Sequence, residues 1–156
     1  MFYSIYLDLL TKGTRDALGE WLNIPKWQWY ITLTFRGSYV SLKASDEEWQ
    51  SWLNSLTLIC KARGYKRPFY FRFTEYQDRG TPHYYVLIGG VGDIRRNLFK
   101  YLWGSIGFAK IEKYEAGKGA NYYVGKYLTK GSGEIRFSHG LKKHLRVGKM
   151  AGASQR

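Results

Sequence analysis

Apolar side chains recur along the chain in short runs that predict β-strands. The stretch 27–35, Trp-Gln-Trp-Tyr-Ile-Thr-Leu-Thr-Phe, is rich in aromatic and β-branched residues, which are enriched in strands. Similar runs occur at 68–75, 82–88 and 108–114. Only a short polar segment around Gly80 separates the second run from the third, so we expect these two strands to form an antiparallel hairpin.

Between these strands, apolar positions with helical spacing predict three helices. The first is expected at 45–63, because Ser45 can cap it, acidic residues follow in its first turn and Gly64 can end it. The others are expected at 93–103 and 115–130. Strands that alternate with helices yet include a hairpin indicate an α+β fold, in which helices cover one face of an antiparallel sheet.

The length and composition of the chain fit one packed domain. Of its 156 residues, 44% are hydrophobic and 18% are aromatic, which is enough apolar material for a core. We expect residues 1–147 to form a single domain and the small, basic residues 148–156 to form a disordered tail.

The charge balance indicates a polyanionic partner. Lysine and arginine number 25 against 12 aspartate and glutamate, which gives a formal net charge of +13. Basic groups placed on phosphates release condensed counterions, so nucleic acid is the expected partner, although a basic surface can also serve solubility alone.

The sequence also excludes several kinds of site and location. Cys60 is the only cysteine, which rules out an intrachain disulfide and a cysteine-based zinc site. No apolar run approaches the roughly 20 residues that span a bilayer, and the N-terminus lacks the basic start of a signal peptide. We therefore expect an intracellular protein without a membrane partner.

The predicted hairpin contains a candidate metal site. Alternation along its second strand places His83 and Tyr85 on one face and Tyr84 on the other. Glu75, near the end of the partner strand, can share the face of His83. A carboxylate and an imidazole directed at one point suit Mg²⁺ or Mn²⁺, but a single histidine on a strand is more often only a polar surface residue.

The third predicted helix contains a stripe of tyrosines and lysines. Helical spacing would align Tyr123, Lys126, Tyr127 and Lys130 on one side. Ammonium groups beside a phenol favour its ionised form, which can attack a phosphodiester. The alternative is an amphipathic helix whose aromatic rings pack on the sheet while its lysines extend into solvent.

Taken together, these segments resemble the motifs of the HUH endonuclease superfamily, named for histidine, a hydrophobic residue and histidine. The stretch 31–35 resembles its first strand motif, 79–85 its metal-binding motif and 123–130 its two-tyrosine nucleophile motif. The stretch 136–141 resembles a segment that often follows the nucleophile helix. The likeness extends over about residues 28–145, in the order that the superfamily has.

The resemblance implies a ferredoxin-like or RRM-like nuclease fold and the activity of a rolling-circle replication initiator from a phage, virus or plasmid. Such a protein works in the host cytoplasm and nicks and rejoins single-stranded DNA at an origin. The reaction passes through a 5′-phosphotyrosine and uses Mn²⁺ or Mg²⁺. The implied partners are single-stranded DNA or an origin hairpin, together with a host helicase and polymerase.

The resemblance also implies roles for individual residues. Tyr123 would be the first nucleophile and Tyr127, one helical turn later, the second. Lys126 would place the phosphate or stabilise developing charge. Contacts to DNA are expected from five basic residues, namely Arg79, Lys130, Arg136, Lys142 and Lys143.

The metal-binding motif departs from the superfamily at one position. Glu75 and His83 match, but Tyr85 stands where the second histidine is expected, and a neutral phenol is a poor metal ligand. Three explanations compete. The cation is held by Glu75, His83 and water; or another residue supplies the missing ligand; or the site has decayed and the protein binds DNA without cutting it.

Two functions without catalysis compete with the nuclease. A basic protein with exposed aromatic rings can bind single-stranded DNA by stacking on its bases, and Tyr85 favours this alternative. A structural RNA-binding protein also fits the charge, but the ordered set of motifs argues against it. A covalent adduct with DNA would exclude both.

Overall fold

A single antiparallel sheet forms the centre of the protein. The computed structural model describes residues 2–37, 40–76 and 80–141. In this part of the chain the sheet has six strands in the order β1-β6-β3-β4-β2-β5, and every neighbouring pair is antiparallel. The strands are β1 (Phe2–Tyr6), β2 (Trp27–Phe35), β3 (Phe69–Tyr76), β4 (Pro82–Gly89), β5 (Gly107–Lys113) and β6 (Glu134–Ser138).

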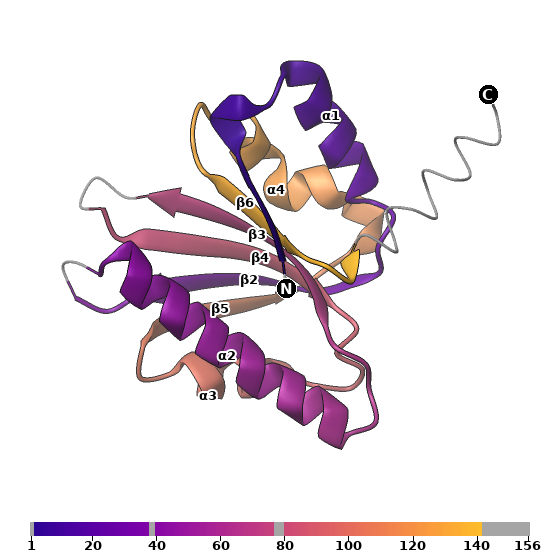
Figure 1. Cartoon of the computed structure of the whole chain (residues 1–156). Coiled ribbons are helices and arrows are strands. Elements are labelled where there is room, and N and C mark those ends of the chain that lie inside the picture. The colour runs from indigo at the N-terminus through magenta and orange to yellow at the C-terminus, as the bar shows by residue number, and fades with distance from the viewer. Residues whose placement is uncertain (1, 38–39, 77–79, 142–156) are drawn as a thin grey trace.

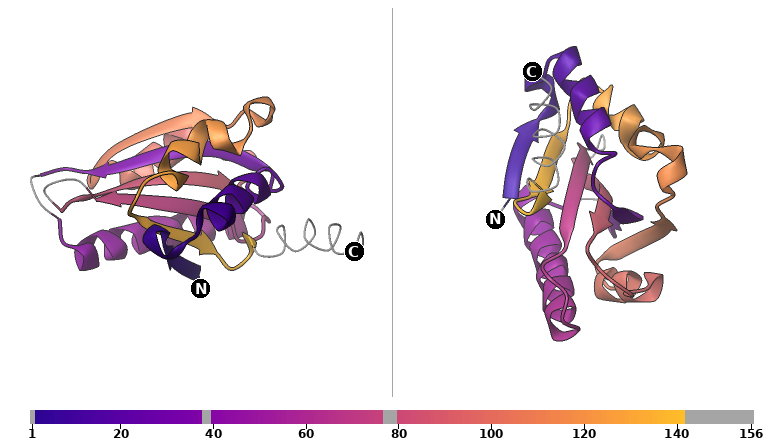
Figure 2. Two further views of the ribbon diagram at one scale, coloured as in Figure 1. Left: turned by 90° about the horizontal axis from the view of Figure 1, so that it is seen from above. Right: turned by 90° about the vertical axis from the view of Figure 1, so that its right-hand side faces the viewer.

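Helices pack on both faces of this sheet (Figures 1 and 2). One face is covered by α2 and α3, whose tryptophans are fully buried against β2 and β4, and the other by α1 and α4. The helices are α1 (Lys12–Trp21), α2 (Leu42–Ala62), α3 (Arg96–Trp103) and α4 (Ala120–Leu128), with short 3-10 helices η1 (Leu7–Leu9) and η2 (Ala116–Lys118).

The predicted α+β class with an antiparallel sheet is confirmed, whereas the prediction that helices cover one face is wrong. The reason lies in the two central strands. In β4, Val86 belongs to the core beneath α2 while its neighbour Leu87 belongs to the core beneath α4. Because consecutive residues of a strand point to opposite faces, an uninterrupted apolar run needs cover on both sides.

Several predicted elements are confirmed with shifted ends. The strand 27–35 and the antiparallel hairpin of β3 and β4 are found as expected. The first predicted helix begins earlier, because Ser41 and not Ser45 is its cap: the Ser41 hydroxyl accepts a hydrogen bond from the amide of Ala44 at 3.1 Å. Ser45 is buried inside the helix, and its hydroxyl donates to the Leu42 carbonyl at 2.9 Å.

The predicted helix 115–130 is shorter in the structure. Gly119 has a φ of 77°, a left-handed conformation that suits glycine, and it separates η2 from α4. Asn23 caps the new start, since its side-chain oxygen accepts a hydrogen bond from the amide of Ala120 at 2.7 Å. The helix then ends at Leu128, so Lys130 lies beyond it.

The sequence did not reveal β1, α1 or β6. The strand β6 carries Glu134 and Arg136, charged residues that are typical of a loop or an exposed edge. Both are buried in the structure, where β6 lies between β1 and β3 and the two charges pair with other buried groups. The pairing depends on strands that are distant in sequence, so no local pattern indicates it.

Candidate functional site

The β3–β4 hairpin brings the two predicted metal ligands together. Glu75 and His83 are direct partners across the two strands. Tyr85 packs on the same side as α4, whereas Tyr84 is buried beneath α2, so the predicted alternation of faces is confirmed. The Tyr85 hydroxyl lies 3.5 Å from Oε1 of Glu75, to which it donates a hydrogen bond.

Tyr127 joins this pair from α4. Its ring stacks on Tyr85 with 4.2 Å between centroids, and on Phe73 with 5.0 Å. Its hydroxyl lies 3.3 Å from that of Tyr30 on β2. Only 3% of Tyr127 is exposed. The phenol that the sequence assigns as second nucleophile is therefore the one that lies over the candidate metal site.

Lys130 completes the group. Its ammonium forms an ion pair with the Glu75 carboxylate and lies 5.6 Å from the centre of the Tyr127 ring. Arg15 on α1 holds this segment in place, because its guanidinium donates to the Lys130 carbonyl at 2.8 Å. We call the five residues of this group the α4 cluster: Glu75, His83, Tyr85, Tyr127 and Lys130.

Lys126 lies at the margin of the α4 cluster. Its side chain is exposed, and its ammonium is 4.9 Å from the centre of the Tyr127 ring. Two cations therefore approach the same phenol ring, and both can reach a phosphate placed beside it.

Tyr123, the predicted first nucleophile, lies away from the α4 cluster. Its hydroxyl accepts a hydrogen bond from the amide of Glu115 at 2.8 Å and donates to the Lys113 carbonyl at 3.4 Å. Its ring packs on Tyr114 and Tyr30. These contacts tie α4 to the end of β5 and occupy the Tyr123 hydroxyl with the backbone.

The surroundings of the tyrosines keep them protonated. Burial raises the pKa of Tyr30 to about 12, against the lowering effect of its hydrogen bond with Tyr127. Burial, followed by the hydroxyls of Tyr30 and Tyr85, raises the pKa of Tyr127 further above its ordinary value. Burial also lowers the pKa of His83, which favours its neutral, metal-binding form.

Alkaline titration tests this cluster of phenols. We expect Tyr30 and Tyr127 to stay protonated as the pH passes 10, because water does not solvate their phenolates. Since the unfolded chain ionises at lower pH, the stability that they contribute is lost as the pH rises above about 10. Tyrosinate absorbance should show a late phase, from which Tyr30→Phe removes one phenol. A single phase near pH 10 in the folded protein would contradict the arrangement.

Arg136, one of the predicted DNA contacts, has another environment. Only 7% of it is exposed, and its guanidinium pairs with Glu134 at 3.1 Å and with Asp46 at 3.1 Å. Arg72, buried on the neighbouring strand, pairs with the same glutamate at 2.6 Å. Its charge is thus balanced inside the protein, on the face opposite the α4 cluster. Three further predicted DNA contacts lie outside the described residues, as does the predicted tail 148–156: Arg79, Lys142 and Lys143.

The donor set of the α4 cluster suits a cation with few protein ligands. Within the described ranges there is no group of three His, Cys, Asp or Glu side chains placed to hold a metal ion. Glu75 and His83 adjoin each other, with the Tyr85 hydroxyl next to the carboxylate. Mg²⁺ keeps several water ligands and accepts one or two from the protein. The residues present therefore fit such a cation, provided that Glu75 exchanges its contact with Lys130.

Two residues of the site were missed in the sequence. Tyr30 belongs to the phenol group because it faces α4 from β2, a position that alternation along the strand 27–35 could have indicated. Tyr122, on the outer side of α4, is 64% exposed, and the ammonium of Lys118 lies 4.6 Å from its ring centre. Its exposure depends on how α4 is turned against the sheet.

No helix in the described part of the chain has the length and apolar character needed to cross a membrane. No curated protein and no solved structure matches the sequence. A family model, that of the replication-associated protein ORF2, matches residues 28–132. This match includes β2, the β3–β4 hairpin and α4, the elements that form the α4 cluster, and it extends over more than half of the chain. The chain therefore belongs to the replication-associated protein ORF2 family.

Proposed function

We propose that this protein initiates replication of a phage, virus or plasmid by nicking and rejoining single-stranded DNA through a tyrosine. The observation that supports this most directly is the position of Tyr127, whose ring stacks on Tyr85 beside the paired Glu75 and His83. A phenol, a carboxylate, an imidazole and two ammonium groups at one place suit phosphoryl transfer. Membership of a replication-associated family assigns the reaction to DNA.

The proposed reaction is a transesterification. The Tyr127 oxygen attacks the scissile phosphorus, its proton passes to water, and a bond forms between phosphorus and the phenol oxygen. The bond from phosphorus to the 3′-oxygen breaks, and that oxygen gains a proton, which leaves a 5′-phosphotyrosine and a free 3′-hydroxyl. The covalent bond preserves the free energy of the phosphodiester, so the reverse reaction rejoins the strand without a nucleotide cofactor.

Glu75 and His83 would hold one Mn²⁺ or Mg²⁺ ion, and Tyr85 would lie beside it. When bound, such a cation polarises the scissile phosphate and lowers the barrier to in-line attack. Lys130, released from Glu75, and Lys126 would balance the charge that develops on the phosphate.

The burial of Tyr127 implies that α4 moves before attack. With 3% of this residue exposed, a DNA strand cannot reach the hydroxyl in the conformation described here. The same movement would release the hydroxyl of Tyr123 from Glu115 and Lys113, so that it could act as the other nucleophile in rejoining or termination.

The direct test is formation of a covalent adduct. The protein is incubated with a pool of labelled single-stranded oligonucleotides and Mn²⁺ and run on a denaturing gel. We expect a labelled band at the mass of the protein, lost when a chelator is added. Tyr85→His is run beside it, because restoring the second imidazole should strengthen cation binding and the band. The absence of a band in both proteins, with intact DNA binding, would overturn the proposal.

That negative outcome would favour the second candidate, a single-stranded DNA-binding protein on the same fold. Two observations favour it: Tyr85 replaces the expected imidazole, and the hydroxyls of both predicted nucleophiles are buried in internal contacts. Adduct formation separates the two functions, since only the nuclease retains labelled DNA after denaturation.

A further inference from the structure

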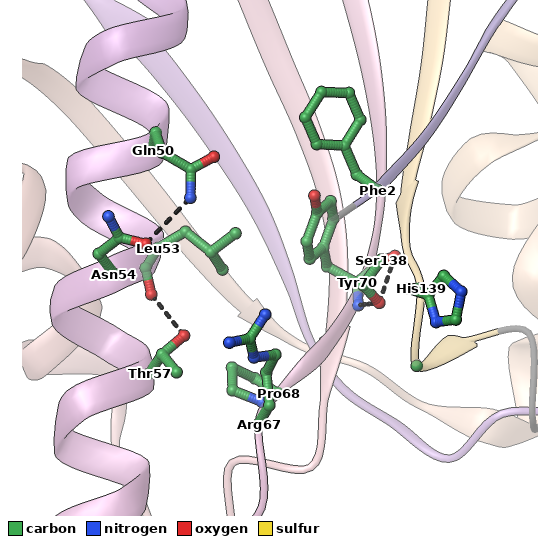
Figure 3. Close-up of a pocket in the computed structure, with 11 residues that line it drawn as sticks. Phe2, Gln50, Leu53, Asn54, Thr57, Arg67, Pro68, Tyr70, Ser138 and His139 are labelled. Atoms are coloured by element: carbon green, nitrogen blue, oxygen red, sulfur yellow. Dashed lines mark hydrogen bonds between the residues drawn. The ribbon is translucent and has the colours of Figure 1, made fainter.

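A small pocket lies between α2 and the edge formed by β1 and β6, on the face opposite the α4 cluster (Figure 3). Gln50, Asn54 and Thr57 line it from α2. Phe2 and His139 line it from β1 and the end of β6. We infer that this pocket binds one adenine base of single-stranded DNA, a conclusion that rests on the proposed interaction with DNA and extends it to the reading of a base.

Two amide side chains give the pocket its hydrogen-bonding character. Nε2 of Gln50 donates to Oδ1 of Asn54 at 2.9 Å, so the two amides hold each other in place (Figure 3). This leaves the Gln50 oxygen as an acceptor and the Asn54 nitrogen as a donor, and in the described residues neither has another side-chain hydrogen bond. Adenine presents the complement, an amino donor beside a ring-nitrogen acceptor, and pairs with asparagine and glutamine in this way.

The size and walls of the pocket suit one flat ring. Its volume is about 70 Å³, space for roughly five water molecules, which matches one base and is too small for a whole nucleotide. Tyr70 and Pro68, both buried, form its inner wall. The Phe2 ring is 42% exposed, with the Arg136 guanidinium 4.1 Å from its centre. An aromatic wall of this kind favours stacking of a base.

Arg67 provides a place for the backbone of the same nucleotide. It lines the pocket from the segment before β3, and its side chain is exposed (Figure 3). Ion pairs in the described part of the chain involve other arginines, so the Arg67 guanidinium has no carboxylate partner there. A base held by Gln50 and Asn54 would place its phosphate near the rim, where Arg67 can neutralise it.

The location of the pocket defines which nucleotide it reads. It lies on the face covered by α2, whereas Tyr127 lies on the face covered by α4, so the base in the pocket is not one of the two that flank the scissile bond. The pocket would therefore hold a base some distance along the strand and fix the position of the nick relative to it.

Equilibrium binding tests the inference without relying on catalysis. Fluorescence anisotropy compares a labelled oligothymidine with the same strand in which one central thymidine is replaced by deoxyadenosine. We expect the wild-type protein to prefer the adenine-containing strand roughly tenfold, the worth of one well-formed base contact, and Gln50→Ala/Asn54→Ala to lose that preference. Both positions are exposed on α2, and the matched control Ser51→Ala, exposed on the same helix outside the pocket, should retain it.

Arg67→Ala should weaken binding to both strands equally, and more than Lys66→Ala, which removes the same charge from a neighbouring position outside the pocket. Equal affinity of the wild-type protein for the two strands would overturn the inference, as would an unchanged preference in the double variant. Competition by free deoxyadenosine monophosphate at concentrations far below those of the oligonucleotide would assign the pocket to a free nucleotide and overturn its role in DNA.

The adduct assay on the same variants separates the two proposals. Adenine preference without any adduct would leave the pocket assignment standing and reject the nuclease. An adduct with no adenine preference would reject the pocket alone.

Discussion

Tyr127→Phe should abolish covalent attachment to DNA, with a loss of roughly 10³-fold or more, because the variant lacks the oxygen that forms the bond to phosphorus. Phenylalanine keeps the ring stacks with Tyr85 and Phe73 and loses only the hydroxyl contact with Tyr30. Its free energy of unfolding should therefore fall by only about 1 kcal/mol. Labelled adduct on a denaturing gel, together with urea unfolding, measures both effects.

Two matched variants complete this experiment. Tyr123→Phe should retain an adduct, because its hydroxyl is hydrogen-bonded to the backbone of Glu115 and Lys113 away from the α4 cluster. Tyr122→Phe removes an exposed hydroxyl from the same helix and should behave as the wild type. The reverse result, an adduct in Tyr127→Phe and none in Tyr123→Phe, would restore Tyr123 as the first nucleophile and reject the role of Tyr127.

Glu134→Ala is expected to destabilise the fold by about 3–5 kcal/mol. Glu134 lies between two buried guanidiniums, 2.6 Å from Arg72 and 3.1 Å from Arg136, and its removal leaves both with half-exposed Asp46 as their remaining carboxylate. Buried charge without a partner is costly, and a domain of this size is stable by only about 5–15 kcal/mol. Urea unfolding followed by tryptophan fluorescence measures the difference.

Asp46→Asn is the control, because this carboxylate is 48% exposed and its loss should cost far less than that of Glu134. A cost for Glu134→Ala no larger than that of the control would show that the buried ion pairs do not stabilise the sheet.

The same residue makes stability depend on pH. Burial alone would raise the pKa of Glu134, but the Ser4 hydroxyl and the guanidiniums of Arg72 and Arg136 outweigh it and hold the pKa below its ordinary value of 4.5. The stabilisation by Glu134 is therefore complete above that pH and declines as the pH falls below it. Glu134→Gln should show a weaker acid dependence of its unfolding free energy than the wild type.

Local pattern alone determined the class of fold and half of the candidate site. Composition and periodicity predicted β2 and the β3–β4 hairpin, because strand propensity and a short turn act between neighbouring residues. The twofold alternation of a strand also placed His83 and Tyr85 on one face and Glu75 beside them. These relations need no information from distant parts of the chain.

The tertiary structure decided which tyrosine belongs to the site. In sequence, Tyr123 and Tyr127 are equivalent members of one helical stripe. Their difference arises from the way α4 packs on the sheet, which places Tyr127 over Tyr85 and directs Tyr123 to the end of β5. Packing of a short helix depends on contacts with α1 and with strands far away in sequence, so periodicity cannot predict it.

Long-range pairing likewise decided the role of the charged strand β6. Arg136 has the composition of a DNA contact, yet it is buried because β6 lies between β1 and β3 and its charge meets Glu134 and Asp46. Burial of a charge depends on where its partner lies, and these partners come together only when the sheet forms. The sequence by itself thus determined the strands and the face that each side chain occupies, whereas the tertiary structure decided which of those side chains meet.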